Sequence, residues 1–247
     1  MMKRQLDLLQ YRDRNVIYGI TLRNAGHWTP YGWTLHPVGA IADNDVVSCR
    51  RGLADVIGID ISRMIIPQQV HGTTIADVTS SDVGRPFTAD GIVTSERNLL
   101  LCISVADCCG VVIWDVKQQL IAAVHSGWRG TAANIVGQCI AHIVERYHIT
   151  PSQLHAWLSP CASRQQYTVR EDVASFLPDF AHPIGGDEFL LDIPGAITSQ
   201  LCAAGIEPSH IAASGLCTIS DDRFHSYRRD REHSGRMAVF TAIVGSE

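Results

Sequence analysis

The sequence predicts a single folded domain that mixes strands and helices. Its 247 residues suffice for one sizeable core, and 46% hydrophobic with 18% charged residues is the composition of an ordinary folded protein. Short apolar runs rich in β-branched residues, which are typical of strands, alternate with segments whose apolar residues recur at helical spacing. No internal repeat, low-complexity stretch or linker marks a boundary, so we expect residues 1–247 to form one domain.

The first half of the chain alternates strand and helix signals. The strand signals lie at residues 16–22, 63–67, 74–78 and 92–94, the last after the turn Thr88-Ala89-Asp90-Gly91. Between the first two strands, Asp43 or Asn44 is expected to cap a helix that ends at Gly58. The apolar positions of this helix predict a buried face made of Val46, Val47, Leu53, Val56 and Ile57.

The stretch from residue 99 to residue 131 is the most informative. Its apolar runs 99–105 and 120–124 predict buried strands, and each ends in polar residues that a packed core would not choose. The first ends in Asp107-Cys108-Cys109, and the second breaks into His125-Ser126-Gly127-Trp128-Arg129-Gly130 before helical spacing begins at Ala132. The helix start near Gly130 can therefore present unpaired backbone N–H groups and Arg129 to an anion.

The last third contains further strands and one clear helix. Strands are expected at 155–158 and 237–244, a short helix near Arg170 after Tyr167-Thr168-Val169, and a longer helix from Pro194 to Gly205. In the segment FHSYRRD, Arg228 and Arg229 beside aromatic residues are suited to clasp an anionic or planar ligand. A basic surface turn paired with Asp230 explains the same residues.

Composition limits the location and the partners of the protein. The segment MMKRQLDLLQ has no apolar signal-peptide core, and the longest apolar run is far shorter than the roughly 20 residues that span a bilayer. We therefore expect a cytoplasmic protein with no membrane contact, whose eight cysteines are mostly reduced thiols. A formal net charge of −5 argues against nucleic-acid binding, and nothing implies an obligate protein partner.

One polar constellation stands out: His71, Cys108 and His125, each of which follows a predicted strand. Two imidazoles and a thiolate are competent zinc ligands, and three protein ligands leave a fourth position for water. Their spacings form no compact metal motif, so a structural thiol and satisfied core histidines are the alternative. Among the nearby arginines, Arg50 falls in the middle of the first helix, where a solvated side chain is the simpler interpretation.

Six segments carry a resemblance to a known family. QQVHG, TADGIVT, VADCCGVVIWD, VHSGWRG, CTISDDRFHSYRRD and SGRM resemble, in order, the motifs of the YfiH family, also called the laccase-domain or peptidoglycan-editing-factor family. The similarity runs from about Val16 to Val244. It implies a single α+β domain of four layers, in which helices flank two packed mixed sheets. It also implies a metal, usually zinc, on the residues that match the family's ligands, His71, Cys108 and His125.

The resemblance further implies an activity on small molecules. Family members phosphorolyse purine nucleosides (adenosine, inosine and methylthioadenosine) and deaminate adenosine, so the enzyme would act as a transferase and a hydrolase. The three metal ligands are then also the catalytic residues. Phosphorolysis needs an anion in line with a glycosidic carbon that develops positive charge, and deamination needs an activated water. The arginines expected to bind the nucleoside or phosphate are Arg50, Arg129, Arg228 and Arg229.

Two other functional classes remain open. The family's older label is a copper polyphenol oxidase, and copper binds such ligands more tightly than zinc, although none of the 11 histidines forms the H-x-H pairs of multicopper oxidases. The other class is an editing hydrolase for cell-wall precursors, with Cys108 as nucleophile and His125 as base. The family's Gly-rich FSTRxGG stretch is replaced by residues 20–26, and its usual Asn-Arg by Cys49-Arg50. These departures leave the substrate open more than the metal.

Overall fold

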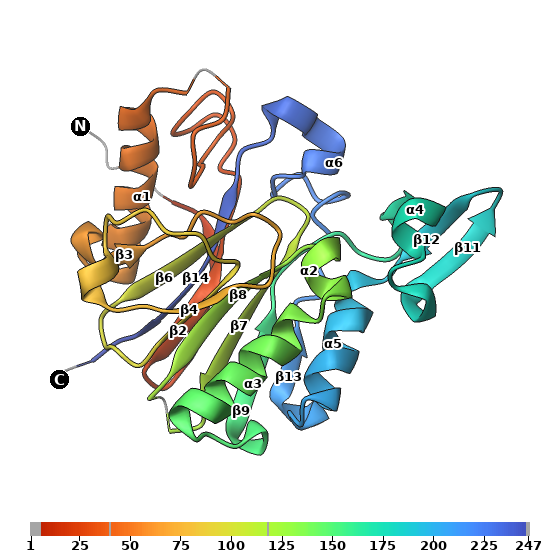
Figure 1. Cartoon of the computed structure of the whole chain (residues 1–247). Helices are drawn as coiled ribbons and strands as arrows, with labels where there is room; N and C mark the ends of the chain where they lie inside the picture. Colours follow the sequence, from red (N-terminus) through yellow and green to blue (C-terminus); the bar gives the residue numbers. More distant parts are fainter. Residues whose placement is uncertain (1–5, 40, 118, 246–247) are drawn as a thin grey trace.

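Strands from both ends of the chain build the first of two large sheets. The computed structural model describes residues 6–39, 41–117 and 119–245; the first half of the segment MMKRQLDLLQ lies outside them. The strand order is β1 (Leu8–Asp13), β2 (Val16–Thr21), β14 (Met237–Ile243), β6 (Leu100–Val105) and β3 (Met64–Ile65). Only β3 and β6 pair in parallel; the other neighbours are antiparallel. The sheet therefore pairs strands from both ends of the sequence with a strand from its middle (Figure 1).

The second sheet is also mixed. Its order is β13 (Ile211–Ala213), β9 (Leu154–Leu158), β7 (Cys109–Asp115), β8 (Ile121–Ser126), β5 (Gly91–Thr94) and β4 (Ile75–Asp77). The outer pairs β13–β9 and β4–β5 are parallel, and the inner pairs are antiparallel. The central strand β7 was not predicted, because its apolar residues continue the run that ends in β6. The chain reverses between them at Asp107, whose φ of 85° lies in the left-handed region.

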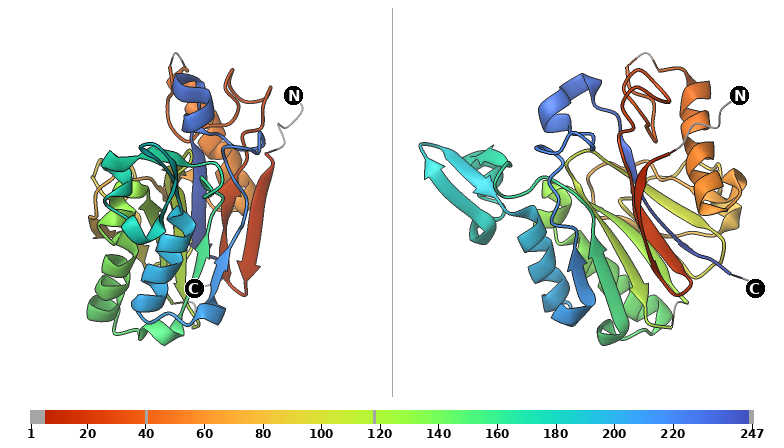
Figure 2. Two further views of the ribbon diagram at one scale, coloured as in Figure 1. Left: turned by 90° about the vertical axis from the view of Figure 1, so that its right-hand side faces the viewer. Right: turned by 180° about the vertical axis from the view of Figure 1, so that it is seen from behind.

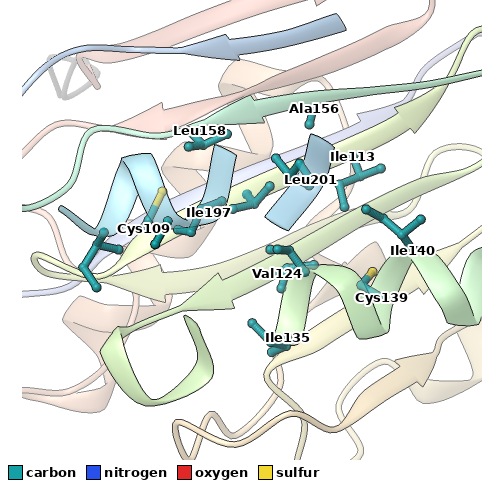
Figure 3. Close-up of a cluster of buried hydrophobic side chains, with 14 of the residues drawn as sticks. Cys109, Ile113, Val124, Ile135, Cys139, Ile140, Ala156, Leu158, Ile197 and Leu201 are labelled. Atoms are coloured by element: carbon teal, nitrogen blue, oxygen red, sulfur yellow. The ribbon is translucent and has the colours of Figure 1, made fainter. Parts of the chain in front are cut away.

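Helices cover the outer faces of the two sheets and complete four layers. Helix α1 (Asp43–Ile57) packs on the first sheet, and α3 (Ile135–Tyr147) and α5 (Ile193–Ala203) pack on the second (Figures 1 and 2). Three hydrophobic cores lie between the four layers. Successive residues of β6 point into two of them: Cys102 faces α1, whereas Ile103 faces the second sheet. Figure 3 shows the third core, in which Val124, Ile140 and Leu201 meet. The four-layer α+β class implied by the resemblance is confirmed.

Helix α1 differs from its prediction at its start and on its buried face. Its N-cap is Ala42 and not Asp43 or Asn44, while its expected end at Gly58 is confirmed, with φ of 76°. Val47 and Val56 are 41% and 48% exposed. The buried stripe instead runs through Val46, Cys49, Leu53, Ala54 and Ile57. A spacing of three to four residues keeps this stripe on one side of the helix, which turns Val47 and Val56 outward.

A small third sheet, not expected from the sequence, projects from the body (Figures 1 and 2). It consists of β10 (Thr168–Arg170), β12 (Glu188–Leu191) and β11 (Ala181–Gly185), with the one-turn helix α4 (Glu171–Ala174) beside it. Strand β11 has a bulge between Pro183 and Gly185 and is mostly exposed, so it carries neither alternation nor an apolar run.

The remaining elements are short. Two one-turn helices are α2 (Trp128–Ala132) and α6 (Tyr227–Asp230). Single turns of 3₁₀ helix lie at Ile61–Arg63, Ser80–Asp82, Pro151–Gln153, Pro178–Phe180, Pro208–His210 and Arg231–His233. Among the described helices, none has both the length and the apolar composition needed to cross a membrane.

Candidate metal centre

The structure brings His71, Cys108 and His125 together. Their ligand atoms all lie within 4.8 Å of one another, and the Cys108 Sγ lies 4.0 Å from the His71 Nε2. The two imidazole rings meet edge to face with centroids 4.8 Å apart. In the described part of the chain, this is the one group of three or more His, Cys, Asp or Glu side chains placed to hold a metal ion.

Three different elements deliver the three side chains. His125 is the fifth residue of β8 and is only 3% exposed, whereas Cys108 directly precedes β7. His71 lies in the loop between β3 and β4 with φ of 61°. Gln69 anchors this loop to β6: its Nε2 donates to the Ser104 carbonyl oxygen (2.9 Å), and its Oε1 accepts from the Ser104 backbone N–H (2.7 Å) and hydroxyl (2.8 Å). The loop is thereby fixed against a core strand.

Asp90 orients the buried histidine, a role that the sequence did not reveal. Its Oδ1 lies 2.8 Å from the His125 Nδ1, which turns the His125 Nε2 toward the metal position. The same carboxylate accepts backbone N–H bonds from Val70, His71 and Gly72, at 3.2, 2.9 and 2.7 Å. Asp90 therefore ties two ligand-bearing segments together. In the sequence its only signal is a turn pattern, which predicts a loop and not a partner for a ligand.

Charge coupling sets the protonation of this centre. Burial disfavours the Asp90 carboxylate, but its hydrogen bonds to His125 and to the backbone outweigh that effect and lower its pKa. Burial likewise opposes the Cys108 thiolate, yet His125 and His71 together lower the Cys108 pKa to about 6. Burial also disfavours a charged His125 ring, but Cys108 and Asp90 raise its pKa to about 9. The metal-free centre therefore favours a thiolate beside an imidazolium.

The donor set fits a zinc ion. One thiolate and two imidazoles, one of them held through its second nitrogen by a carboxylate, are typical of zinc sites, and three donors leave one position open. Glycine at position 127, in the turn after His125, leaves room for the side chains of Cys108 and His71. A Cβ at this position would lie 2.8 Å from the Cys108 Sγ and 3.2 Å from the His71 Cδ2. The neighbouring Cys109 points away into the core with Val111 and Ile113, as the parity of the strand predicts (Figure 3).

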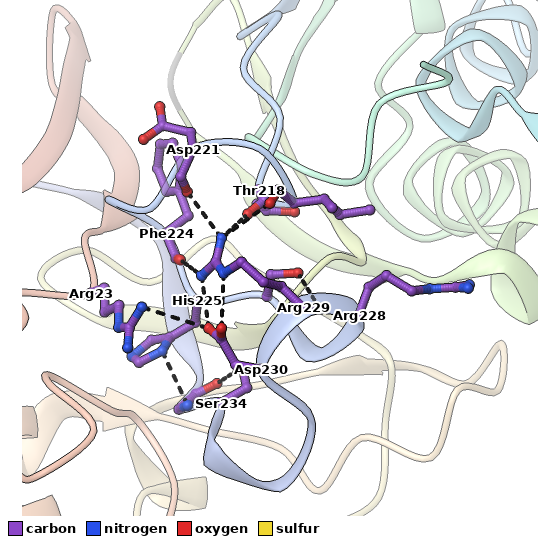
Figure 4. A network of polar contacts seen from close by, with 12 residues as sticks. Arg23, Thr218, Asp221, Phe224, His225, Arg228, Arg229, Asp230 and Ser234 are labelled. Carbon is purple, nitrogen blue, oxygen red and sulfur yellow. Dashed lines mark hydrogen bonds and ion pairs between the residues drawn. The ribbon is translucent and has the colours of Figure 1, made fainter. Parts of the chain in front are cut away.

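Arg229 has a structural role. Its guanidinium forms two bonds to Asp230 (2.8 and 2.7 Å) and also donates to the carbonyl oxygens of Thr218, Ile219 and Phe224 (Figure 4). With a sixth, longer bond to the Asp221 carbonyl oxygen (3.4 Å), these contacts engage every N–H donor of the group. The pairing with Asp230 is thus present, and substrate binding by Arg229 stays a prediction.

The guanidinium groups of Arg228 and Arg129 each cover an aromatic ring, and the ring under Arg228 lies close to Cys108. The Arg228 guanidinium carbon lies 5.0 Å from the ring centre of Tyr167. Burial raises the pKa of Tyr167, and the nearby Cys108 raises it further. The corresponding distance from Arg129 to Trp128 is 4.2 Å. Helix α2 begins at Trp128, two residues before Gly130, and it is a single turn. Anion binding at this helix start stays a prediction.

Arg50 and Arg236 each donate a side-chain hydrogen bond to a backbone carbonyl oxygen. Arg50 falls in the middle of α1 as expected, but it is half-buried, and its Nε donates to the Leu35 carbonyl oxygen at 2.9 Å. The solvated interpretation of Arg50 is therefore wrong. Arg236 lies near Cys108, which raises the Arg236 pKa against the larger lowering effect of burial. The motif SGRM contains Arg236, yet a single arginine before a strand gave no reason to assign it to the site.

Comparison with known proteins places the chain in a family. The family model described as "Multi-copper polyphenol oxidoreductase laccase" matches residues 20–244. Among similar proteins, purine nucleoside phosphorylase YlmD of Geobacillus stearothermophilus is 35% identical, over 79% of this chain and 78% of the relative. A purine nucleoside phosphorylase of Corynebacterium glutamicum is 32% identical, over 94% of this chain and 96% of the relative.

Solved structures agree with these sequence matches. The crystal structure of a hypothetical protein YfiH from Bacillus licheniformis has a TM-score of 0.90 and 27% identity, and covers 99% of this chain and 98% of that one. That of YlmD from Geobacillus stearothermophilus has a TM-score of 0.86 and 31% identity, with 94% and 93% covered. The chain therefore belongs to the YfiH family, the family of the multi-copper polyphenol oxidoreductase laccase model, as its motifs predicted.

Proposed function

We propose that the protein is a zinc-dependent purine nucleoside phosphorylase that also deaminates adenosine. The observation that carries the proposal is the three-donor centre in which Asp90 orients His125; three donors would leave one position of a bound zinc ion open. The names of the relatives support the same reaction class. The expected substrates are adenosine, inosine and methylthioadenosine, with inorganic phosphate as the second substrate of phosphorolysis.

In the proposed phosphorolysis the metal centre and the nearby arginines have different roles. A phosphate oxygen attacks the sugar carbon of the glycosidic bond, and the base leaves with the bonding electrons and takes up a proton. A bound zinc ion supplies a Lewis acid at this position. Arg228, Arg129 and their aromatic partners are assigned to the nucleoside, because flat apolar rings and cationic groups suit a purine and its sugar.

Deamination of adenosine in the same pocket is the second activity that we propose. It needs an activated water at the purine C6, and an open zinc position lowers the pKa of bound water toward 7. The H-x-E and P-C-x-x-C pattern of ordinary zinc deaminases does not occur in the sequence. The water must therefore be activated by the His-Cys-His set, which explains why one centre serves both reactions.

The alternative functions make different demands on the site. A multicopper oxidase needs several groups of histidine ligands, whereas the described residues provide one three-donor group. A single copper ion on these donors would leave weak oxidation of phenols as the expected activity. An editing hydrolase would use the thiolate–imidazolium form of Cys108 and His125 without metal.

Metal analysis followed by product analysis tests the proposal. Protein purified without added metal should contain about one zinc per chain, and His125→Ala should contain far less. With adenosine and phosphate we expect adenine and ribose 1-phosphate, and without phosphate we expect inosine. Copper in place of zinc with phenol oxidation, or turnover that survives complete metal removal, would contradict the proposal.

A further inference from the structure

A small cavity lies beside the loop that leads to His71. It has a volume of about 250 Å³, and His36, Gln69, Ser104 and Arg236 line it. This is below the 300–1,000 Å³ of pockets for drug-sized ligands, so it suits a small ion. None of its lining residues is acidic. A basic cavity of this size without a carboxylate is suited to an inorganic anion.

Arg236 is half-buried and only partly paired. Its Nη1 donates to the carbonyl oxygens of Ser234 (2.7 Å) and Gly235 (3.0 Å), which fixes the direction of the side chain. Among the described residues, no hydrogen-bond acceptor or ion pair engages the Arg236 Nη2 or Nε. Burial lowers the Arg236 pKa because the charge is poorly hydrated there. Its unengaged donors therefore favour a negatively charged ligand.

Arg50 adds positive charge close to His36, which lines the same cavity and adds a hydrogen-bond donor. The Arg50 Nε donates to the carbonyl oxygen of Leu35, the residue before His36, and its two Nη atoms have no acceptor in the described part of the chain. The nearest carboxylate that acts on Arg50 is Asp43, at the start of α1. Burial, then Arg50 and Arg236, lower the His36 pKa to about 4. His36 is therefore neutral at pH 7 and can still donate one N–H bond.

One loop connects the cavity and the metal centre. Gln69 and Ser104, which line the cavity, are joined by three hydrogen bonds, and Gln69 lies two residues before His71. Arg236 lies between the two sites, since it lines the cavity and is also affected by Cys108, Tyr227 and Asp107. An anion in the cavity would thus lie beside a substrate that is held at the metal.

We propose that this cavity binds inorganic phosphate as the second substrate, through Arg236, Arg50 and His36. The assignment rests on the proposed phosphorolysis and specifies its anion site. The expected phosphate ligands change accordingly: Arg236 and His36 join Arg50, and Arg229 leaves the set. The same chemistry would recognise the phosphate group of a nucleoside monophosphate, so the test includes both ligands.

Calorimetric titration of zinc-loaded protein with inorganic phosphate tests the site directly. Arg236→Met and Arg50→Met should each weaken phosphate binding about tenfold or more, because each removes a charge-assisted hydrogen bond. Arg51→Met is the matched control, since Arg51 follows Arg50 on the same helix but is exposed. In turnover assays the two test variants should raise the KM for phosphate about tenfold, whereas Arg51→Met should leave it unchanged.

The possible outcomes separate this inference from the proposed function. Phosphorolysis with an unchanged KM for phosphate in both test variants would overturn the cavity assignment and leave the proposed function standing. Phosphate binding without phosphorolysis would support the anion site and refute the proposed function. Binding of adenosine monophosphate, with none of free phosphate, would overturn the assignment as second-substrate site. If Arg236→Met does not fold, Arg236→Lys and His36→Asn provide the same comparison.

Discussion

Among single residues, Asp90 decides how His125 acts. A free histidine offers either ring nitrogen to a metal. In His125 the Nδ1 is engaged by the Asp90 Oδ1 at 2.8 Å, so the Nε2 is the nitrogen left to bind a metal. The three backbone N–H groups on the same carboxylate fix its position and lower its pKa. Its burial, with an exposed fraction of 0%, keeps water from competing for these bonds.

Asp90→Asn is predicted to weaken metal binding while the fold persists. The amide keeps the size of the side chain but loses the charge that holds the His125 Nδ1–H, and we expect zinc affinity to fall roughly 10- to 100-fold. Competition with a zinc chelator measures this affinity. Asp77→Asn is the matched control, because Asp77 forms a similar pair with His142 (3.1 Å) on the outer surface. Equal zinc affinity in the two variants would show that Asp90 does not support the metal.

The adjacent thiols Cys108 and Cys109 should respond differently to alanine. Cys109 is fully buried beside Val111, so Cys109→Ala removes one small side chain from the core. It should cost about 1 kcal/mol of unfolding free energy and leave zinc in place. Cys108→Ala removes the thiolate and should abolish activity and most of the bound zinc. Elemental analysis and adenosine turnover in both variants check this; a metal-free Cys109→Ala beside a zinc-loaded Cys108→Ala would reverse the assignment.

The sequence indicated the three candidate metal ligands, which the structure brings together, and missed the residues that position them. Cysteine and histidine have few roles, so their occurrence after predicted strands pointed to a site. Asp90, Gln69 and Arg236 are common residue types in loops, and their roles follow from contacts between segments that are distant in the sequence. The structural bonds of Arg229 were missed for the same reason, since most of its acceptors are backbone carbonyl oxygens that no sequence pattern displays.

At the scale of elements, the turn between β8 and α2 shapes the metal centre. Gly127 is the N-cap of α2, and its missing side chain leaves space for two ligands. The expected continuous helix after this turn is instead two helices, because Asn134 adopts φ of 56° and caps α3 through a bond from the Gly137 N–H (3.2 Å). The sequence showed the helical spacing but not this break.

Gly127→Ala is predicted to disturb the metal centre more than the fold. The added Cβ would lie 2.8 Å from the Cys108 Sγ, closer than such atoms approach, and would push the thiolate out of place. We expect zinc affinity to fall at least tenfold with little change in melting temperature. Gly130→Ala, three residues later, is the control, because its nearest neighbour would be an Ile135 methyl group at 3.3 Å. Normal zinc content in Gly127→Ala would contradict this account.

Strand prediction failed where pairing, and not local pattern, defines the strand. Strand β7 merges with β6 into one apolar segment of the sequence, and only the left-handed backbone at Asp107 separates them. Strand β11 contains Pro183 and Gly185 and exists because it pairs with β12. The strands that were predicted correctly have apolar runs bounded by turn residues, as in β2 and β14.

For the whole molecule, motif order predicted more than periodicity did. Local patterns indicated strands and helices but no arrangement, whereas the ordered motifs implied four layers, which the structure confirms. The reason is that β6, β14 and β2 pair across almost the full length of the chain. Such long-range pairing leaves no signal within a short window. The third sheet, which packs at one side of this body, remained outside both kinds of prediction.

His225 links distant parts of the molecule and should make its stability depend on pH. The ring is fully buried; its Nε2 lies 2.8 Å from the Trp33 carbonyl oxygen, and its Nδ1 accepts the Gly235 N–H at 3.1 Å (Figure 4 shows its surroundings). This bonding pattern requires a neutral ring with the proton on Nε2. Burial lowers the His225 pKa from 6.5 to about 4, even though the bond to Trp33 opposes the shift.

The sign of the pH effect follows from this lowered pKa. Between pH 6.5 and about 4 the unfolded chain binds the proton on His225 and the folded chain does not, so the stabilisation present above pH 6.5 is lost as the pH falls. One such group contributes a slope of at most about 1.4 kcal/mol per pH unit.

His225→Gln should lower the unfolding free energy at pH 7, because the hydrogen bond from the Gly235 N–H loses its acceptor. It should also reduce the slope between pH 6.5 and 4. Urea unfolding at pH 7, 6 and 5 measures both effects, with His182→Gln, at an exposed position of β11, as the control for removing a histidine. An unchanged slope in His225→Gln would mean that His36, whose pKa is also lowered to about 4, or other groups account for the loss of stability in acid.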